Sequence, residues 1–139
     1  MIVADTNLIG YLYLESNYSA LAEQAWRKDA EWVAPLLWRS EFRNVLAHYI
    51  RKQWLTLEES QQVMTSALEL METQEYEVDS DRVLRLVAGS NCSAYDCEFV
   101  ALAQELGISL VTVDKQILKD FPALAVSLAN FVGHEESGG

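Results

Sequence analysis

Short apolar runs alternate with stretches of helical periodicity along this chain of 139 residues. Residues 1–4 are apolar at every position and end at Asp5, and the apolar run at 108–114 ends at Asp114. Such runs are typical of strands buried on both faces of a parallel sheet. We expect further short strands at 32–34, at 75–78 (as an edge strand) and at 125–128.

Between these strands, apolar residues recur at helical spacing. Two capping boxes, Thr56 to Glu59 and Ser93 to Asp96, each predict a helix start, and Gly107 predicts a helix end. The expected helices are 7–13, 17–28, 36–52, 80–88 and 116–120, with one from Thr56 to about residue 71 and one from Ser93 to Gly107. Strands that alternate with helices predict an α/β domain with a parallel sheet and helices on both faces.

Length and composition fit a single globular domain. Half of the residues are hydrophobic and four are Trp, for which burial in the core is the default expectation. We expect one domain over 1–132 and a flexible tail over 133–139. The start of the chain lacks the features of a signal peptide, and no apolar stretch approaches the roughly 20 residues that span a bilayer, so a cytoplasmic protein with no membrane contact is expected. Cys92 and Cys97 do not form a C-x-x-C pair and are expected to be reduced.

The formal net charge of −11 argues against non-specific binding of nucleic acid. A nuclease with this charge needs a local basic strip, although most such cations are ordinary surface residues. The candidates nearest in sequence to acidic motifs are Arg39, Arg43, Lys115 and Lys119. Arg51 and Lys52 are expected to act on the dipole of their helix, and His48 to be structural.

Four carboxylates are distinguished by their positions. Asp5 and Asp114 each end an apolar strand, and ligands of parallel sheets collect beyond the carboxyl ends of the strands. Asp96 falls on the apolar side of its helix and Glu41 flanks an apolar stripe, where an unpaired charge is costly. Each acid also has a simpler reading: Asp5, Asp96 and Asp114 as helix caps, and Glu41 as a solvated residue.

If the four acids converge, a divalent cation would relieve their repulsion, which is about 4 kcal/mol for two charges ~4 Å apart at an effective dielectric near 20. An all-oxygen site suits Mg²⁺ or Mn²⁺ and disfavours zinc. A bound Mg²⁺ can polarise a phosphodiester and activate water. The residues alone leave this site and the capping alternatives both open.

In order and spacing these segments resemble the acidic motifs of PIN-domain nucleases, and in size the chain is most similar to VapC-type toxins of type II toxin–antitoxin pairs. The segments are 2–7 (IVADTN), 40–42 (SEF), 93–97 (SAYDC) and 110–114 (LVTVD). The resemblance implies a PIN-like three-layer α/β/α fold, cleavage of RNA with Mg²⁺ or Mn²⁺, a homodimer and inhibition by a cognate antitoxin. It also implies that Asp5 and Asp96 are the principal metal ligands, that Asp114 and Glu41 complete the site, and that Asn7 and Thr112 orient them.

Other classes of function fit parts of the sequence pattern. The acidity favours, as the main alternative, a catalytically silent PIN-like interaction module. A receiver-type signalling domain needs paired acids after its first strand, where this chain has only Asp5. A ribonuclease-H-type enzyme needs an opening meander of strands that the pattern does not predict.

Overall fold

The computed structural model describes residues 1–133, in which strands and helices alternate as the apolar pattern predicts. The strands are β1 (Ile2–Ala4), β2 (Trp32–Pro35), β3 (Glu75–Tyr76), β4 (Leu110–Thr112) and β5 (Ala125–Ser127). The helices are α1 (Thr6–Tyr13), α2 (Ser19–Lys28), α3 (Trp38–Arg51), α4 (Leu57–Leu70), α5 (Ser80–Ala88), α6 (Ala94–Leu106), α7 (Lys115–Asp120) and α8 (Leu128–Phe131).

The five strands form one parallel sheet in the order β3-β2-β1-β4-β5. The first strand is central, since Val3 of β1 pairs with Val33 of β2 on one side and with Leu110 of β4 on the other. β3 lies at the edge, as its alternating pattern predicts. Because β1 and β4 are parallel neighbours, the segments that follow them leave the sheet side by side.

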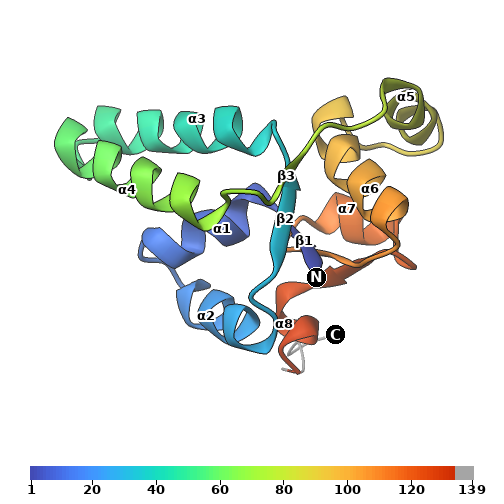
Figure 1. The fold of residues 1–139 in the computed structure, drawn as a ribbon, viewed down its shortest axis with the longest axis horizontal. Coiled ribbons are helices and arrows are strands. Elements are labelled where there is room, and N and C mark those ends of the chain that lie inside the picture. Colours follow the sequence, from blue (N-terminus) through green and yellow to red (C-terminus); the bar gives the residue numbers. More distant parts are fainter. Residues whose placement is uncertain (134–139) are drawn as a thin grey trace.

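Helices cover both faces of the sheet, which confirms the expected three-layer architecture. In Figure 1 the sheet is seen nearly edge-on, with α1 to α4 on one side and α5, α6 and α7 on the other. α6 packs on β1, β2 and β4, while α1 packs on β1 and β4 from the opposite face. α3 and α4 lie against each other as a hairpin that projects from the domain.

The predicted caps form at both helix starts. The Thr56 hydroxyl accepts the Glu59 amide, and the Glu59 carboxylate accepts the Thr56 amide in return. Ser93 begins α6 by accepting the Asp96 amide, and Gly107 ends it in the left-handed region at φ 65°. These turns depend only on neighbouring residues, which is why the sequence predicts them well.

One helix differs from the expectation. We expect a strand over 125–128, but the strand ends at Ser127, whose side chain accepts the Asn130 amide and starts α8. α8 has four residues, too few for helical periodicity to show in the sequence. Of the predicted tail, residues 134–139 lie outside the described residues, whereas Gly133 donates its amide to the Asn130 carbonyl.

Two of the four Trp side chains are fully buried in the core. Trp32 and Trp38 are buried, and Trp26 packs edge-on against Trp32. Trp54 is 60% exposed, so the default expectation of core burial is wrong for this residue. Cys92 and Cys97 are buried and free, as expected for reduced thiols.

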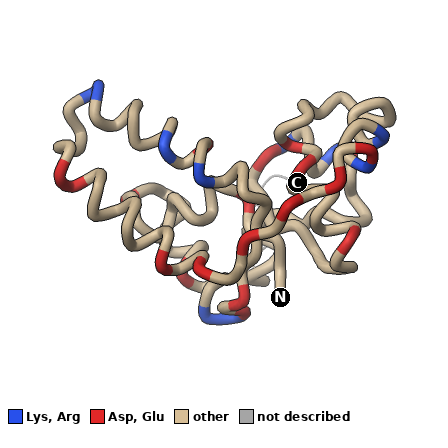
Figure 2. The backbone as a smooth tube through the Cα atoms, turned by 45° about the horizontal axis from the view of Figure 1, so that its top comes forward, with Lys and Arg blue, Asp and Glu red and all other residues tan. Residues whose placement is uncertain are grey.

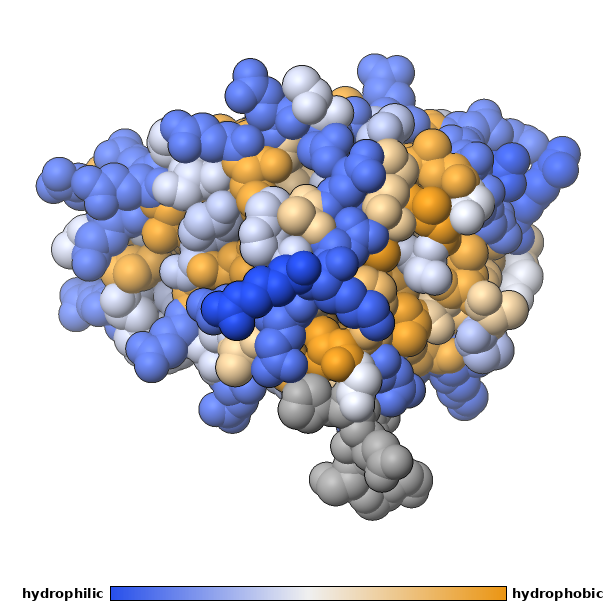
Figure 3. All heavy atoms as spheres, turned by 60° about the horizontal axis from the view of Figure 1, so that its bottom comes forward, coloured by the Kyte–Doolittle hydropathy of each residue, from blue (hydrophilic) through white to orange (hydrophobic). Residues whose placement is uncertain are grey.

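Hydrophobic side chains also reach the surface between hydrophilic ones, as the space-filling view in Figure 3 shows for one face. Exposed apolar residues are ordinary for a folded domain. Among the helices of residues 1–133, none has the length and apolar character needed to cross a bilayer.

Candidate active site

Asp5 lies at the carboxyl end of β1 and faces β4. Its amide donates to the Val111 carbonyl (3.2 Å), and its carboxylate accepts the Thr112 hydroxyl (2.6 Å). Although Asp5 occupies the N-cap position of α1, its side chain makes no capping hydrogen bond. Its carboxylate is therefore held toward the neighbouring strand and not toward its own helix.

Thr112 joins two of the predicted acids. Its hydroxyl donates to the Asp5 carboxylate and accepts the Asp114 backbone amide (3.0 Å), so it links Asp5 to the backbone at the end of β4. Asp114 also caps α7, because its Oδ1 atom accepts the Ile117 amide (3.0 Å). The capping interpretation of Asp114 is thus correct, and it coexists with a place beside Asp5.

Glu41 reaches the same edge from the first turn of α3. Its carboxylate accepts the hydroxyl of the buried Thr6 (2.7 Å), the residue directly after Asp5. Sequence reasoning singled out Asn7 and Thr112 as orienting residues and missed Thr6. Its position between Asp5 and Asn7 in the first motif is the signal that could have found it; Asn7 itself is exposed.

Asp96 approaches from the other layer, in the first turn of α6. Its amide donates to the Ser93 hydroxyl (3.1 Å), which makes Ser93 the N-cap of α6. Burial raises the pKa of the Asp96 carboxyl, and the negative charge of Asp114 raises it further, against the lowering effect of Ser93. Asp96 and Asp114 are therefore close enough to repel each other.

Electrostatic repulsion links the remaining acids to this pair. Burial raises the pKa of Asp5, the hydrogen bond from Thr112 and the nearby Asn7 backbone amide lower it, and the charges of Asp114 and Asp96 raise it again. The charges of Asp5, Asp96 and Asp114 therefore influence one another, and the parallel pairing of β1 with β4 places the ends of these two strands side by side.

Glu41 belongs to the same group. Burial raises the pKa of its carboxyl, the Thr6 hydrogen bond lowers it, and the charges of Asp5, Asp96 and Glu98 raise it. Glu98 was not among the predicted site residues. Its signal in the sequence is weak, since it is one acid within a largely apolar helix whose inward face is already marked by Asp96.

The four predicted acids thus gather at one edge of the sheet, called the acidic edge from here on. Within residues 1–133, no group of three His, Cys, Asp or Glu side chains is arranged closely enough to hold a metal ion. The donor set nevertheless fits Mg²⁺ or Mn²⁺, because it consists of carboxylate oxygens and the acids repel one another in the absence of a cation.

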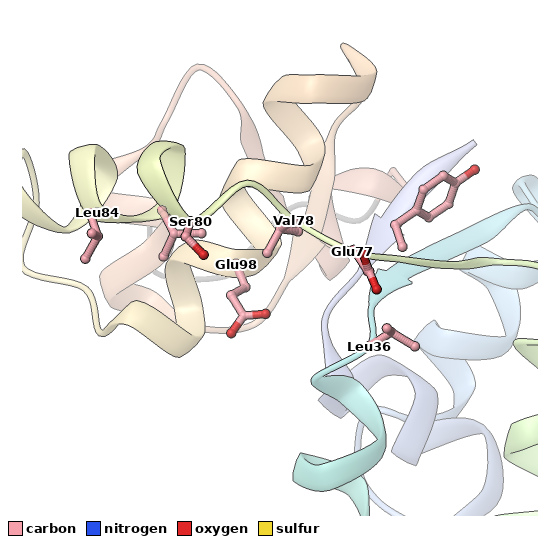
Figure 4. Close-up of a pocket in the computed structure, with 8 residues that line it drawn as sticks. Leu36, Glu77, Val78, Ser80, Leu84 and Glu98 are labelled. Atoms are coloured by element: carbon pink, nitrogen blue, oxygen red, sulfur yellow. The ribbon is translucent and has the colours of Figure 1, made fainter.

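A cleft of about 590 Å³ opens beside the acidic edge. Glu98 extends from α6 into the space facing Leu36, the residue that follows β2, and α5 forms the far wall with Leu84 (Figure 4). Burial raises the pKa of Glu98. The cleft therefore combines apolar walls with acids and offers no cation to a phosphate among its lining residues.

The candidate phosphate contacts differ in how free they are. Arg39 forms an ion pair with Glu75 on β3 through two hydrogen bonds, and Trp38 donates to the same carboxylate. The positive charge of Arg39 is therefore neutralised by Glu75. Arg43, Lys115 and Lys119 form no ion pair or hydrogen bond with the part of the chain that the structure describes. Figure 2 shows Lys and Arg segments recurring along α3, while the neighbouring α4 carries acidic segments only.

The parallel three-layer fold and its acidic edge define a class of domain, and sequence comparison agrees with it. The PIN domain profile matches residues 2–124, and the chain belongs to this family.

Two proteins from Pyrobaculum aerophilum are similar to this chain. The chain is 28% identical over 126 residues to the protein described as Ribonuclease VapC3, an alignment that covers 88% of this chain and 96% of that one. It also superposes on the crystal structure of PAE2754 with a TM-score of 0.74 and 18% identity, over 94% of this chain and 92% of that one. The second likeness concerns the fold alone.

Proposed function

We propose that this protein is a metal-dependent endoribonuclease and the toxin of a toxin–antitoxin pair. The observation that carries the proposal is the acidic edge, where Asp5, Glu41 and Asp96 have pKa values raised by burial and by one another's charge. Neighbouring acids whose pKa values are raised by burial and by one another's charge are characteristic of functional sites. The relationship to a VapC ribonuclease supplies the substrate class.

In this proposal Asp5, Asp96, Asp114 and Glu41 hold Mg²⁺ or Mn²⁺, directly or through water. The ion supplies polarisation of a phosphodiester and a water of lowered pKa. Thr112 and Thr6 fix the orientation of Asp5 and Glu41 through the hydrogen bonds described above. These hydrogen bonds orient the carboxylates and oppose the rise in pKa that burial causes, as orienting partners of metal ligands do.

The proposal extends to partners and location. RNA is the substrate, a cognate antitoxin inhibits the enzyme, and the protein acts in the cytoplasm as a homodimer. An adjacent small open reading frame whose product relieves growth arrest caused by this protein would support the toxin assignment. Growth that is unaffected by expression of the active enzyme would contradict it.

The direct test is cleavage of total RNA by the purified protein with and without Mg²⁺. We expect cleavage that EDTA abolishes and that Asp96→Asn removes while circular dichroism shows an intact fold. Asp81→Asn is the matched control, since Asp81 is an exposed acid paired with Arg85 on α5. Cleavage that persists in EDTA and in Asp96→Asn would refute the proposal.

A catalytically silent interaction module is the second candidate. The lack of three metal-binding side chains already gathered within residues 1–133 favours it. Titration with Mn²⁺, followed by its paramagnetic effect on water relaxation, separates the two. Binding that Asp5→Asn abolishes supports the enzyme, and no binding up to millimolar Mn²⁺ supports the silent module.

A further inference from the structure

The exposed side of α3 that adjoins Glu41 differs in charge from the rest of the chain. Residues 42–57 contain no Asp or Glu, and this is the longest acid-free stretch of a protein with net charge −11. Three of the ten Lys and Arg residues lie within it, namely Arg43, Arg51 and Lys52. None of the three forms an ion pair or a hydrogen bond through its side chain with residues 1–133.

Helical geometry separates these cations into two groups. With about 100° between successive residues, Asn44, His48, Arg51 and Lys52 fall within about 80° of Glu41 around the axis, whereas Arg43 lies about 160° away. All four are exposed. The row extends from Glu41 over about 15 Å along the axis, at 1.5 Å per residue.

Trp54 completes this row at the tip of the α3–α4 hairpin. It is 60% exposed, yet its position is fixed: its amide donates to the Tyr49 carbonyl (3.0 Å), and its ring packs edge-to-face with His48 and Tyr49 at 5.5 and 5.2 Å. Gln53 turns the chain at φ 59° to place it there. A Trp held in place but left open to solvent is suited to stack on an unpaired base.

We propose that Asn44, His48, Arg51, Lys52 and Trp54, here called the α3 strip, bind single-stranded RNA and lead it to the acidic edge. The inference rests on the proposed ribonuclease function and assigns the surface that holds its substrate. Cations beside an aromatic platform bind phosphates and bases of single strands without reading sequence. Arg51 and Lys52 also suit the end of the α3 dipole, but that role does not account for the fixed, exposed ring of Trp54.

The test measures the binding of a fluorescent single-stranded RNA by anisotropy, with Asp96→Asn as background to prevent cleavage. The double change Arg51→Gln/Lys52→Gln is expected to weaken binding about tenfold and to reduce the slope of log K against log salt by about 1.4, because each phosphate contact contributes about 0.7 for single strands. Trp54→Ala is expected to weaken binding about fivefold or more with the slope unchanged, and Trp54→Phe to restore part of the loss.

Arg27→Gln/Arg85→Gln is the matched control, since it removes the same number of positive charges from exposed positions on α2 and α5. We expect it to leave the affinity within about twofold of the background. Equal losses of affinity in Arg27→Gln/Arg85→Gln and Arg51→Gln/Lys52→Gln would contradict RNA binding by the α3 strip. So would unchanged RNA affinity with an altered sedimentation mass for Trp54→Ala, which would make the tip a protein interface.

Cleavage assays separate this inference from the function on which it rests. With Mg²⁺ and Asp96 restored, the strip variants are expected to raise KM and to retain kcat. If the wild type cleaves RNA and the strip variants have the same KM, the proposed binding role of the α3 strip is refuted and the ribonuclease proposal is retained. If the wild type binds RNA through the α3 strip but does not cleave it, the ribonuclease proposal is refuted and the proposed binding surface is retained.

Discussion

Acidic side chains occur at both ends of the parallel strands, in opposite circumstances. At the amino ends of β1 and β2, Asp29 accepts a hydrogen bond from the Met1 ammonium (2.6 Å) and another from the Glu31 amide (2.9 Å). Burial works against ionisation there, but these hydrogen bonds and the ammonium charge hold the pKa of Asp29 below its usual value. At the carboxyl ends, Asp5 faces other acids and its pKa is raised.

The contrast shows how one residue type serves two purposes in one sheet. Asp29 comes with its own cation and adds to stability, whereas the acidic edge is held at a cost to stability and is suited to a cation from solution. Asp→Asn substitutions at the two ends are therefore expected to differ in sign for stability and in size for activity.

The largest expected difference is in catalysis. Asp5→Asn removes a carboxylate of the proposed metal site and is expected to lower kcat/KM for RNA at least about 100-fold, since the loss of even an orienting partner costs about 10- to 100-fold. Asp29→Asn is expected to retain the wild-type value within about twofold. Comparable losses in both variants would remove the functional distinction between the two ends.

Metal binding gives the next largest effect. Mg²⁺ or Mn²⁺ at ten times its Kd is expected to add about 1.4 kcal/mol to the free energy of unfolding and to raise Tm by a few degrees. Differential scanning fluorimetry of the wild type measures this shift, and Asp96→Asn is expected to lose it. A shift of the same size in both proteins would place the cation elsewhere.

A smaller effect is expected on the stability of the metal-free protein. The folded-state pKa of Asp5 is raised, so its ionised form disfavours folding at neutral pH, and this penalty disappears as the pH falls through that pKa. In EDTA, Asp5→Asn is therefore expected to raise Tm by a few degrees at pH 7 and by less at acid pH. A lower Tm for Asp5→Asn at pH 7 would contradict the assigned repulsion.

The smallest effect concerns Asp29. Its folded-state pKa is lowered, so its contribution is present above its unfolded pKa, about 3.9, and is lost as the pH falls through the folded value. Asp29→Asn is expected to cost about 0.5 kcal/mol at neutral pH and low salt, as is typical of an ion pair near the surface. Urea titrations at pH 7 and at low pH measure the difference, which salt should reduce.

The parts of the fold that local pattern specifies were predictable. Largely apolar runs located β1 and β4, and the caps at Thr56 and Ser93 located α4 and α6 within a residue. α8 was missed because a four-residue helix has no period of its own. The strand order was not predictable from the strands themselves, since it depends on which apolar faces the connecting helices cover.

The candidate site was predictable only where position in the chain carries the signal. Asp5 and Asp114 could be paired because each ends an apolar strand. Three interactions near the site each link residues of different elements. They are the hydrogen bond from Thr6 to Glu41, the repulsion between Glu98 and Glu41, and the ion pair of Arg39 with Glu75. Such contacts depend on how the helices pack on the sheet, and the periodicity of apolar residues within one element does not predict them.

The hydrogen bond from Thr112 to Asp5 joins residues separated by 107 positions. During synthesis Asp5 leaves the ribosome early, but β4 must also emerge and dock beside β1 before the two strand ends meet. A nascent chain that ends before residue 110 carries Asp5, Glu41 and Asp96 without the strand that aligns the first of them. The proposed nuclease would thus stay inactive on the ribosome until β4 has emerged and paired with β1.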